Sequence, residues 1–215
     1  MLSRTETSAM EKLKRYTFLA LAGYGVLFLV SFLVSIPAGL GKAESIHDPS
    51  SLWLYGRRAL MVVLALTLPR PSRDGSLRSL GWRVSLRWVF IAVLVGVCVG
   101  FGNPGGFDPT LPVAVCLALF HTFATELFFR GYLFRTLAVS LKREKVALVL
   151  SSFLYGLSYL TVSTTWGLPL AGRFAFVALF TFLGLLFAWS YRKSGSILVP
   201  WMMHFFGVLK YRVLF

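Results

Sequence analysis

Long apolar runs recur along the whole chain, and they constrain its fold more than any other feature. A helix needs roughly 20 apolar residues to cross the core of a bilayer. Seven runs approach this length, at about residues 16–40, 51–68, 88–101, 111–139, 146–162, 174–191 and 197–209. Because lipid cannot hydrogen-bond to an exposed backbone, such runs indicate helices. We therefore expect an all-α integral membrane protein, a bundle of about seven transmembrane helices.

The composition excludes several other classes of protein. Of the 215 residues, 57% are hydrophobic and only 14% are charged, whereas soluble domains average about half apolar and a quarter charged. A disordered chain, a collagen-like chain and most soluble enzymes are therefore excluded. The two cysteines, Cys98 and Cys116, both lie within apolar runs. Their number and position suggest neither a disulfide framework nor a zinc knuckle.

The first two runs need separate interpretation. A basic flank before the first run resembles the start of a signal peptide. The run is long for that role and further spans follow, so we interpret it as a retained helix. The second run is interrupted by Arg57 and Arg58. Either their side chains extend to the membrane surface, or this helix faces protein or water.

The positive charge indicates how the chain is oriented in the membrane. The sequence has 22 Lys and Arg against 8 Asp and Glu, a net charge of +14. Most of the basic residues lie in four alternate connections, within 4–15, 70–87, 135–145 and 192–193. The positive-inside rule then places the N-terminus in the cytoplasm, in an inner or plasma membrane. Seven spans would put the C-terminus outside, but Lys210 and Arg212 argue against this, so its side stays open. Because the charge is divided among loops, we expect the lipid bilayer as a partner and no nucleic acid.

Ionisable groups within spans are costly, so they are the first place to look for function. Glu126 is the one acid within the predicted spans, and Arg130 follows four residues later on the same helix face. These two residues can pair. His121 and Thr125 form a second polar stripe, about 100° around the helix from the first. A buried pair that only fixes helix packing explains Glu126 and Arg130 equally well.

Two later runs add further polar groups. Tyr155 and Tyr159 share a face of the fifth run, and His204 lies in the last run. Ordinary packing explains the tyrosines, and a hydrogen-bonded interior histidine explains His204. Spacing alone thus predicts a polar cluster in a helical bundle and leaves its purpose open.

Three segments resemble the motifs of a known family. Residues 125–133, Thr-Glu-Leu-Phe-Phe-Arg-Gly-Tyr-Leu, resemble the first motif of the CPBP family, the CAAX proteases and bacteriocin-processing enzymes, also called the Abi family. Residues 151–160 resemble its second motif, 194–204 resemble the approach to its third, and 80–83 resemble a common family feature. We therefore expect an N-terminal region over 1–79 with two helices, and a CPBP-like core over 80–215, together forming one structural unit.

The resemblance implies an intramembrane endopeptidase with a polar cavity, which cuts peptide bonds near or within the membrane. The family takes its catalytic groups from a leading glutamate, a second-motif histidine, and a third-motif histidine with Asn or Asp. On this chain these positions hold Thr125, Tyr159, His204 and Val208, so three of the four are substituted. Glu126 and Arg130 match the second glutamate and the arginine of the first motif, which suggests supporting roles, and Tyr155 replaces a usual Phe.

The substituted side chains change the available chemistry. A threonine needs a partner to deprotonate it, a tyrosine is a donor near neutral pH, and valine offers no donor. Whether the chain holds a cofactor stays open, because a metal site needs about three protein ligands. A metal at His204 and Glu126 would be under-liganded. Alternative roles exist: His204 as a base, Tyr159 as an oxyanion donor, Glu126 as the replacement carboxylate, and His121 as an activator of Thr125.

Two functions follow from this comparison, and whether the chain is an enzyme stays open. The leading hypothesis is a catalytically degenerate relative that binds a membrane peptide or assists a partner processing enzyme. The alternative is an active endopeptidase that cleaves membrane-anchored proteins with altered groups. A weaker transporter-like interpretation rests only on charged residues such as Arg57 and Arg58 within spans. The geometry around His204 distinguishes the first two.

Overall fold

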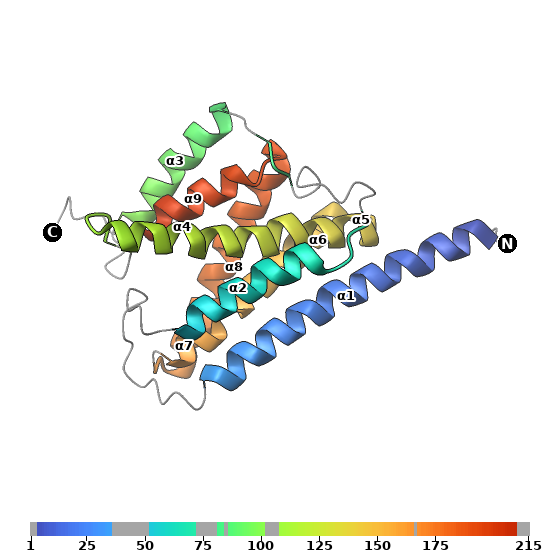
Figure 1. Cartoon of the computed structure of the whole chain (residues 1–215), viewed down its shortest axis with the longest axis horizontal. Coiled ribbons are helices and arrows are strands. Elements are labelled where there is room, and N and C mark those ends of the chain that lie inside the picture. Colours follow the sequence, from blue (N-terminus) through green and yellow to red (C-terminus); the bar gives the residue numbers. More distant parts are fainter. Residues whose placement is uncertain are drawn as a thin grey trace.

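A computed structural model describes residues 4–35, 52–71, 81–83, 86–101, 108–165 and 167–209. Its helices, in chain order, are α1 (Arg4–Ser35), α2 (Leu52–Thr67), α3 (Leu86–Gly100), α4 (Pro112–Glu126), the π-helix η2 (Leu127–Phe134), α5 (Arg135–Leu141), α6 (Glu144–Leu157), α7 (Leu160–Thr165), α8 (Leu170–Ser194) and α9 (Leu198–Val208). Figure 1 shows how they are arranged. Within the described residues, each predicted apolar run falls largely in helix, so the all-α fold class is confirmed.

Four helical segments are long and apolar enough to cross a membrane. They are Ser8–Leu33, Pro112–Leu141, Glu144–Thr164 and Leu170–Ser194. The second of these joins α4, η2 and α5 into one continuous rod. Leu86–Gly100 and Leu198–Val208 are apolar but shorter. The chain is therefore a multi-pass integral membrane protein in which some of the seven predicted segments are shorter than a full span.

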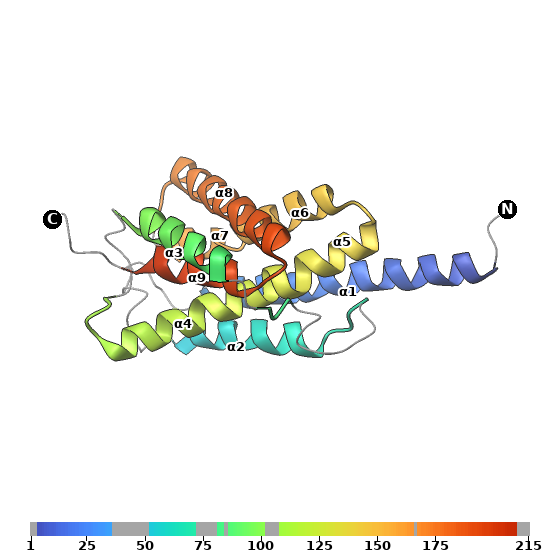
Figure 2. The same cartoon turned by 90° about the horizontal axis from the view of Figure 1, so that it is seen from above.

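The rod formed by α4, η2 and α5 lies at the centre of the bundle. Helix α2 packs against α4 and η2, α1 packs along α5, α6 contacts η2, and α9 contacts α4 (Figures 1 and 2). Every residue from Ala124 to Phe134 is buried. A helix that is buried all round belongs in the interior of a protein, which explains why this stretch carries large aromatic residues on every side.

Glycines allow the closest contacts between helices. A Cβ atom at Gly156 of α6 would lie 2.6 Å from the backbone oxygen of Val177 in α8. A Cβ atom at Gly96 of α3 would lie 2.5 Å from the backbone oxygen of Met203 in α9. Small residues at helix interfaces are typical of membrane proteins, where close backbone packing replaces the hydrophobic driving force. The pairs α6–α8 and α3–α9 are accordingly in extensive contact.

Several of the basic connections meet at one end of the bundle. Arg192 Nε, at the end of α8, lies 2.9 Å from Glu144 Oε2 at the start of α6. The segment 81–83 joins the same end, because the oxygen of Gly81 accepts a hydrogen bond from the Ile197 amide at 2.9 Å. The side of the membrane that this end faces stays a prediction, and Lys210 and Arg212 lie outside the described residues.

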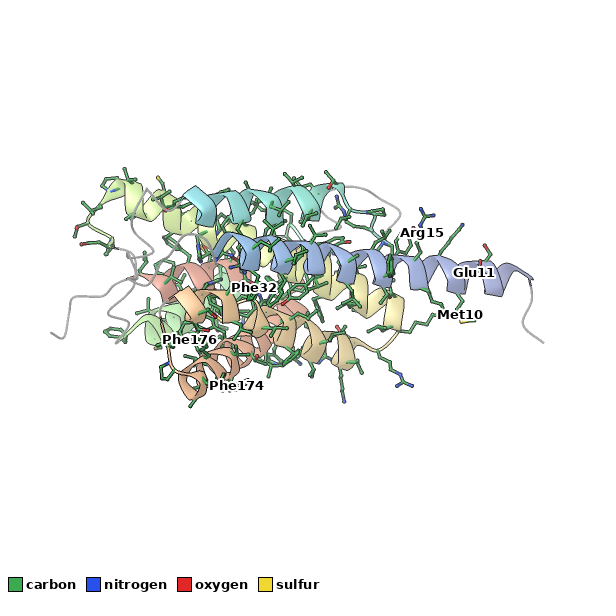
Figure 3. The ribbon with its side chains drawn as sticks, turned by 90° about the horizontal axis from the view of Figure 1, so that it is seen from below. Met10, Glu11, Arg15, Phe32, Phe174 and Phe176 are labelled. Carbon is green, nitrogen blue, oxygen red and sulfur yellow. The ribbon has the colours of Figure 1, made fainter. Side chains whose placement is uncertain are left out.

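Helix α1 differs from the first predicted run at its start. It begins at Arg4 and not near residue 16, so the basic flank continues the helix. Figure 3 shows Met10, Glu11 and Arg15 on the part of α1 that extends beyond the other helices, with Phe174 and Phe176 of α8 toward the opposite end. The predicted end of this run, 36–40, lies outside the described residues.

Candidate functional site

Glu126 stands where the central rod changes from α-helix to π-helix. It is the last residue of α4, and η2 begins at Leu127. Its side chain is completely buried. Short π-helical segments are rare and frequently occur at functional sites. The irregular segment therefore coincides with the one acid of the predicted spans.

Two side chains hold the Glu126 carboxylate. His204 Nδ1 lies 2.7 Å from Glu126 Oε1, and Arg130 Nε lies 3.2 Å from Oε2. Arg130 also donates from Nη2 to the backbone oxygen of Gly184 at 3.1 Å. The ion pair thus links the central rod to α8 and α9. It confirms that Glu126 and Arg130 share a helix face and pair.

Aromatic rings enclose this polar centre. The Phe187 ring stacks on the His204 ring at a centroid distance of 5.0 Å. The Tyr155 ring meets the His204 ring edge-on at 6.2 Å, and the Arg130 guanidinium carbon lies 4.4 Å from the Tyr155 centroid. A cation over an aromatic face is attracted by the ring, more strongly where water is excluded. Phe187 and Tyr155 therefore both position the charged groups and exclude water from them.

A second polar group lies beside the first. Arg58 Nε, from α2, donates to His121 Nδ1 at 3.1 Å. Arg58 Nη2 also lies 3.1 Å from His121 Nε2. A neutral imidazole has one acceptor nitrogen and a guanidinium only donates, so one of these two contacts is a hydrogen bond. The His121 and His204 rings are 6.2 Å apart, centroid to centroid.

The substituted family positions have partners of their own. Thr125 Oγ1 donates to the backbone oxygen of His121 at 2.8 Å, within its own helix. The Tyr159 hydroxyl lies 3.2 Å from the Tyr155 hydroxyl, and its ring stacks on Phe180 at 3.7 Å. Val208 is partly buried and packs against a small apolar cluster that includes Phe205.

The structure thus brings together some predicted site residues and separates others. Glu126, Arg130, His204 and Tyr155 form one cluster, and His121 joins Arg58 in the next one. Within the described residues, no group of three His, Cys, Asp or Glu side chains is placed to hold a metal ion. Cys98 and Cys116 are exposed on α3 and α4.

Sequence reasoning did not identify three contributors to the site. Nothing marks the Gly184 oxygen or the Phe187 ring in the sequence, because each contributes through its position in the fold. The contact between Arg58 and His121 joins residues 63 apart in the chain. Its only signal was the presence of two arginines in an apolar run.

Comparison with known proteins identifies one family. Residues 107–209 match the family model described as type II CAAX prenyl endopeptidase, Rce1-like. No curated protein and no solved structure matches the chain. The matched region contains the three motif-bearing segments 125–133, 151–160 and 194–204. Over residues 107–209, just under half of its length, this membrane protein is therefore similar to the Rce1-like, type II CAAX prenyl endopeptidase family, in agreement with the CPBP resemblance of its motifs.

Proposed function

We propose that the protein binds a membrane-anchored peptide or protein next to the Glu126–His204 pair and does not cleave it. The match to an endopeptidase family supports a membrane-anchored polypeptide as the ligand class. The bound molecule is either a sequestered peptide or the substrate of a partner processing enzyme.

This proposal rests on the burial of the Glu126 carboxylate and on the two side chains that contact it. Arg130 and His204 both contact it, and the side chains of all three residues are at most 4% exposed. A general base must reach the water or hydroxyl that it deprotonates. Here Phe187 lies against the histidine ring, and the family positions that would add catalytic groups hold Thr125 and Val208. We therefore infer that the cluster holds helices together and does not act as a general base.

Photocrosslinking tests the binding step. A photoreactive phenylalanine analogue at Phe180, whose ring lies against Tyr159, should label membrane-anchored peptides added to the protein in nanodiscs. The matched control is the same analogue at Phe90 of α3, which is 66% exposed and far from the site in the sequence. Labelling at position 180 that exceeds labelling at 90, with the peptide mass intact, supports the proposal. Equal labelling at both positions contradicts it.

One observation favours a second function, an active endopeptidase with altered groups. The 2.7 Å contact of Glu126 with His204 has the geometry of a carboxylate that orients a histidine base. The Tyr159 hydroxyl would then serve as an oxyanion donor. This function requires that the wild-type protein release peptide fragments, and that His204→Gln abolish their release while leaving the protein folded.

A further inference from the structure

Two adjacent arginines of α2 are buried, and the described part of the chain offers them no carboxylate partner. Arg57 is 5% exposed and Arg58 is 2% exposed. Figure 1 shows α2 between α1 and α4, and it packs against both. Among the described residues, no Asp or Glu oxygen lies within 4.0 Å of either guanidinium. Buried charges are otherwise paired or bound to an ion, because removing them from water is costly.

Arg57 has one buried hydrogen-bond donor, Nε, for which the described residues supply no acceptor. A guanidinium carries five N–H groups. The described contact of Arg57 is a donation from Nη2 to the backbone oxygen of Ser158 at 3.2 Å, and that oxygen also accepts from Thr161 Oγ1. The Arg57 Nε atom is buried and has no hydrogen-bond partner within the described ranges. The positive charge of the Arg57 guanidinium therefore has no counter-charge among the described residues.

Arg58 is better satisfied, but only by neutral groups. It contacts His121, and its Nη1 lies 3.3 Å from the Met61 sulfur. Glu126 is already engaged by Arg130 and His204. Among the described residues, the buried interior therefore holds three guanidinium groups, Arg57, Arg58 and Arg130, against one carboxylate.

We propose that Arg57 and Arg58 form a binding site for an oxyanion, a carboxylate or phosphate group, which supplies the missing negative charge. Arginine guanidinium groups bind both kinds of oxyanion through paired N–H donors. The Tyr159 hydroxyl, which lies 3.2 Å from the Tyr155 hydroxyl, is close enough to Arg58 to interact with it electrostatically and provides a neutral donor. The oxyanion comes either from a dissolved anion or from a phospholipid headgroup. This site lies beside the Glu126–His204 pair, since the His121 ring that contacts Arg58 is 6.2 Å from the His204 ring, but it does not depend on the peptide-binding function.

Thermal unfolding of the full-length protein in a maltoside detergent, which contains no phosphate, tests the site. One arm titrates inorganic phosphate or acetate against sodium chloride at matched ionic strength. The other arm adds phosphatidic acid to the micelles. A ligand that binds only the folded protein raises Tm with a saturable dependence on concentration. We expect such a rise in at least one arm, and the responding arm identifies the source of the anion.

Substitutions distinguish this site from the many surface cations of a chain with a net charge of +14. Arg57→Gln should abolish the saturable rise, whereas Arg70→Gln, at a partly exposed arginine beyond the end of α2, should retain it. If Arg57→Gln does not fold, Arg57→Lys keeps the charge but loses the paired donors. It should raise the half-saturating concentration about tenfold. No saturable rise in either arm, or an equal rise in the Arg57 variants, would overturn the proposal.

Discussion

The Nδ1 atom of His204 lies 2.7 Å from Oε1 of Glu126, although 78 residues separate them in the chain. This contact joins α9 to the central rod at the point where its π-helix begins. It also brings together a first-motif residue and a third-motif residue of the family that the sequence resembles. The question is whether the contact serves catalysis or holds the helices together.

Loss of the Glu126 charge should destabilise the protein strongly. Glu126→Gln leaves the Arg130 guanidinium buried without a counter-charge. Removing one partner of a buried ion pair costs about 3–5 kcal/mol, so we expect a loss of that size in the free energy of unfolding. Denaturant unfolding of the detergent-solubilised protein measures it.

The matched control is the exposed ion pair between Glu144 and Arg192. Its side chains are 49% and 34% exposed. Solvent screens such pairs, so Glu144→Gln should cost no more than about 1 kcal/mol. Equal effects of Glu126→Gln and Glu144→Gln would mean that the buried carboxylate does not stabilise the bundle.

The contact between α6 and α8 depends on Gly156. An alanine there would place its Cβ atom 2.6 Å from the Val177 oxygen and against Thr181. Overpacking of this kind costs about 1–3 kcal/mol, so Gly156→Ala should lower Tm. The control is Gly25→Ala in α1, where nothing lies within 4 Å of the added Cβ atom. Alanine favours a helix over glycine, so this control should keep or raise Tm, and a Gly156→Ala protein as stable as wild type would refute the close packing.

The positions of the helices could be predicted from the sequence because the signal is local. A run of apolar residues such as 174–191 determines by itself that a helix forms, and α8 includes it. The pairing of Glu126 with Arg130 was also predictable, since both lie on one helix. The motif resemblance added the expectation that His204 belongs to the same site.

The remaining features depend on contacts between helices that no spacing rule encodes. The π-helix over Leu127–Phe134 is not visible in apolar periodicity, because the whole stretch is buried and has no polar face. The Arg58–His121 contact and the Phe187–His204 stacking require knowledge of which helices are neighbours. The structure provides this information, and with it the aromatic enclosure of the polar centre.

The predicted orientation can be tested with single cysteines. After Cys98→Ser and Cys116→Ser, the Thr110→Cys and Lys145→Cys variants place one thiol on each predicted side. If the basic connections are cytoplasmic, a membrane-impermeant maleimide added to intact cells should label position 110 and not 145. Permeabilised cells should show labelling at both positions. Labelling of position 145 alone in intact cells would show that the orientation is the reverse of the predicted one.

If the protein fails to cleave peptides only because catalytic side chains are missing, restoring the family residues should give it endopeptidase activity. The triple variant Thr125→Glu, Tyr159→His and Val208→Asn replaces the three substituted positions. We expect it to cleave a membrane-anchored peptide that the wild type leaves intact, because a base and oxyanion donors are then present beside His204. Fragment formation followed by mass spectrometry measures this gain. A folded triple variant without activity would mean that the surrounding packing also blocks catalysis.

The central claim is that the protein binds a membrane-anchored peptide without cleaving it. Incubation of the wild-type protein with such a peptide in water labelled with heavy oxygen tests this claim most directly. Peptide-bond cleavage transfers one water oxygen to the new carboxylate, so each hydrolytic event leaves a mass label. We predict that membrane-anchored peptides bound or crosslinked at the site incorporate no heavy oxygen, whether they are incubated with the wild-type protein or with His204→Gln. Labelled fragments that form with wild type and disappear with folded His204→Gln would contradict the account and establish an active endopeptidase.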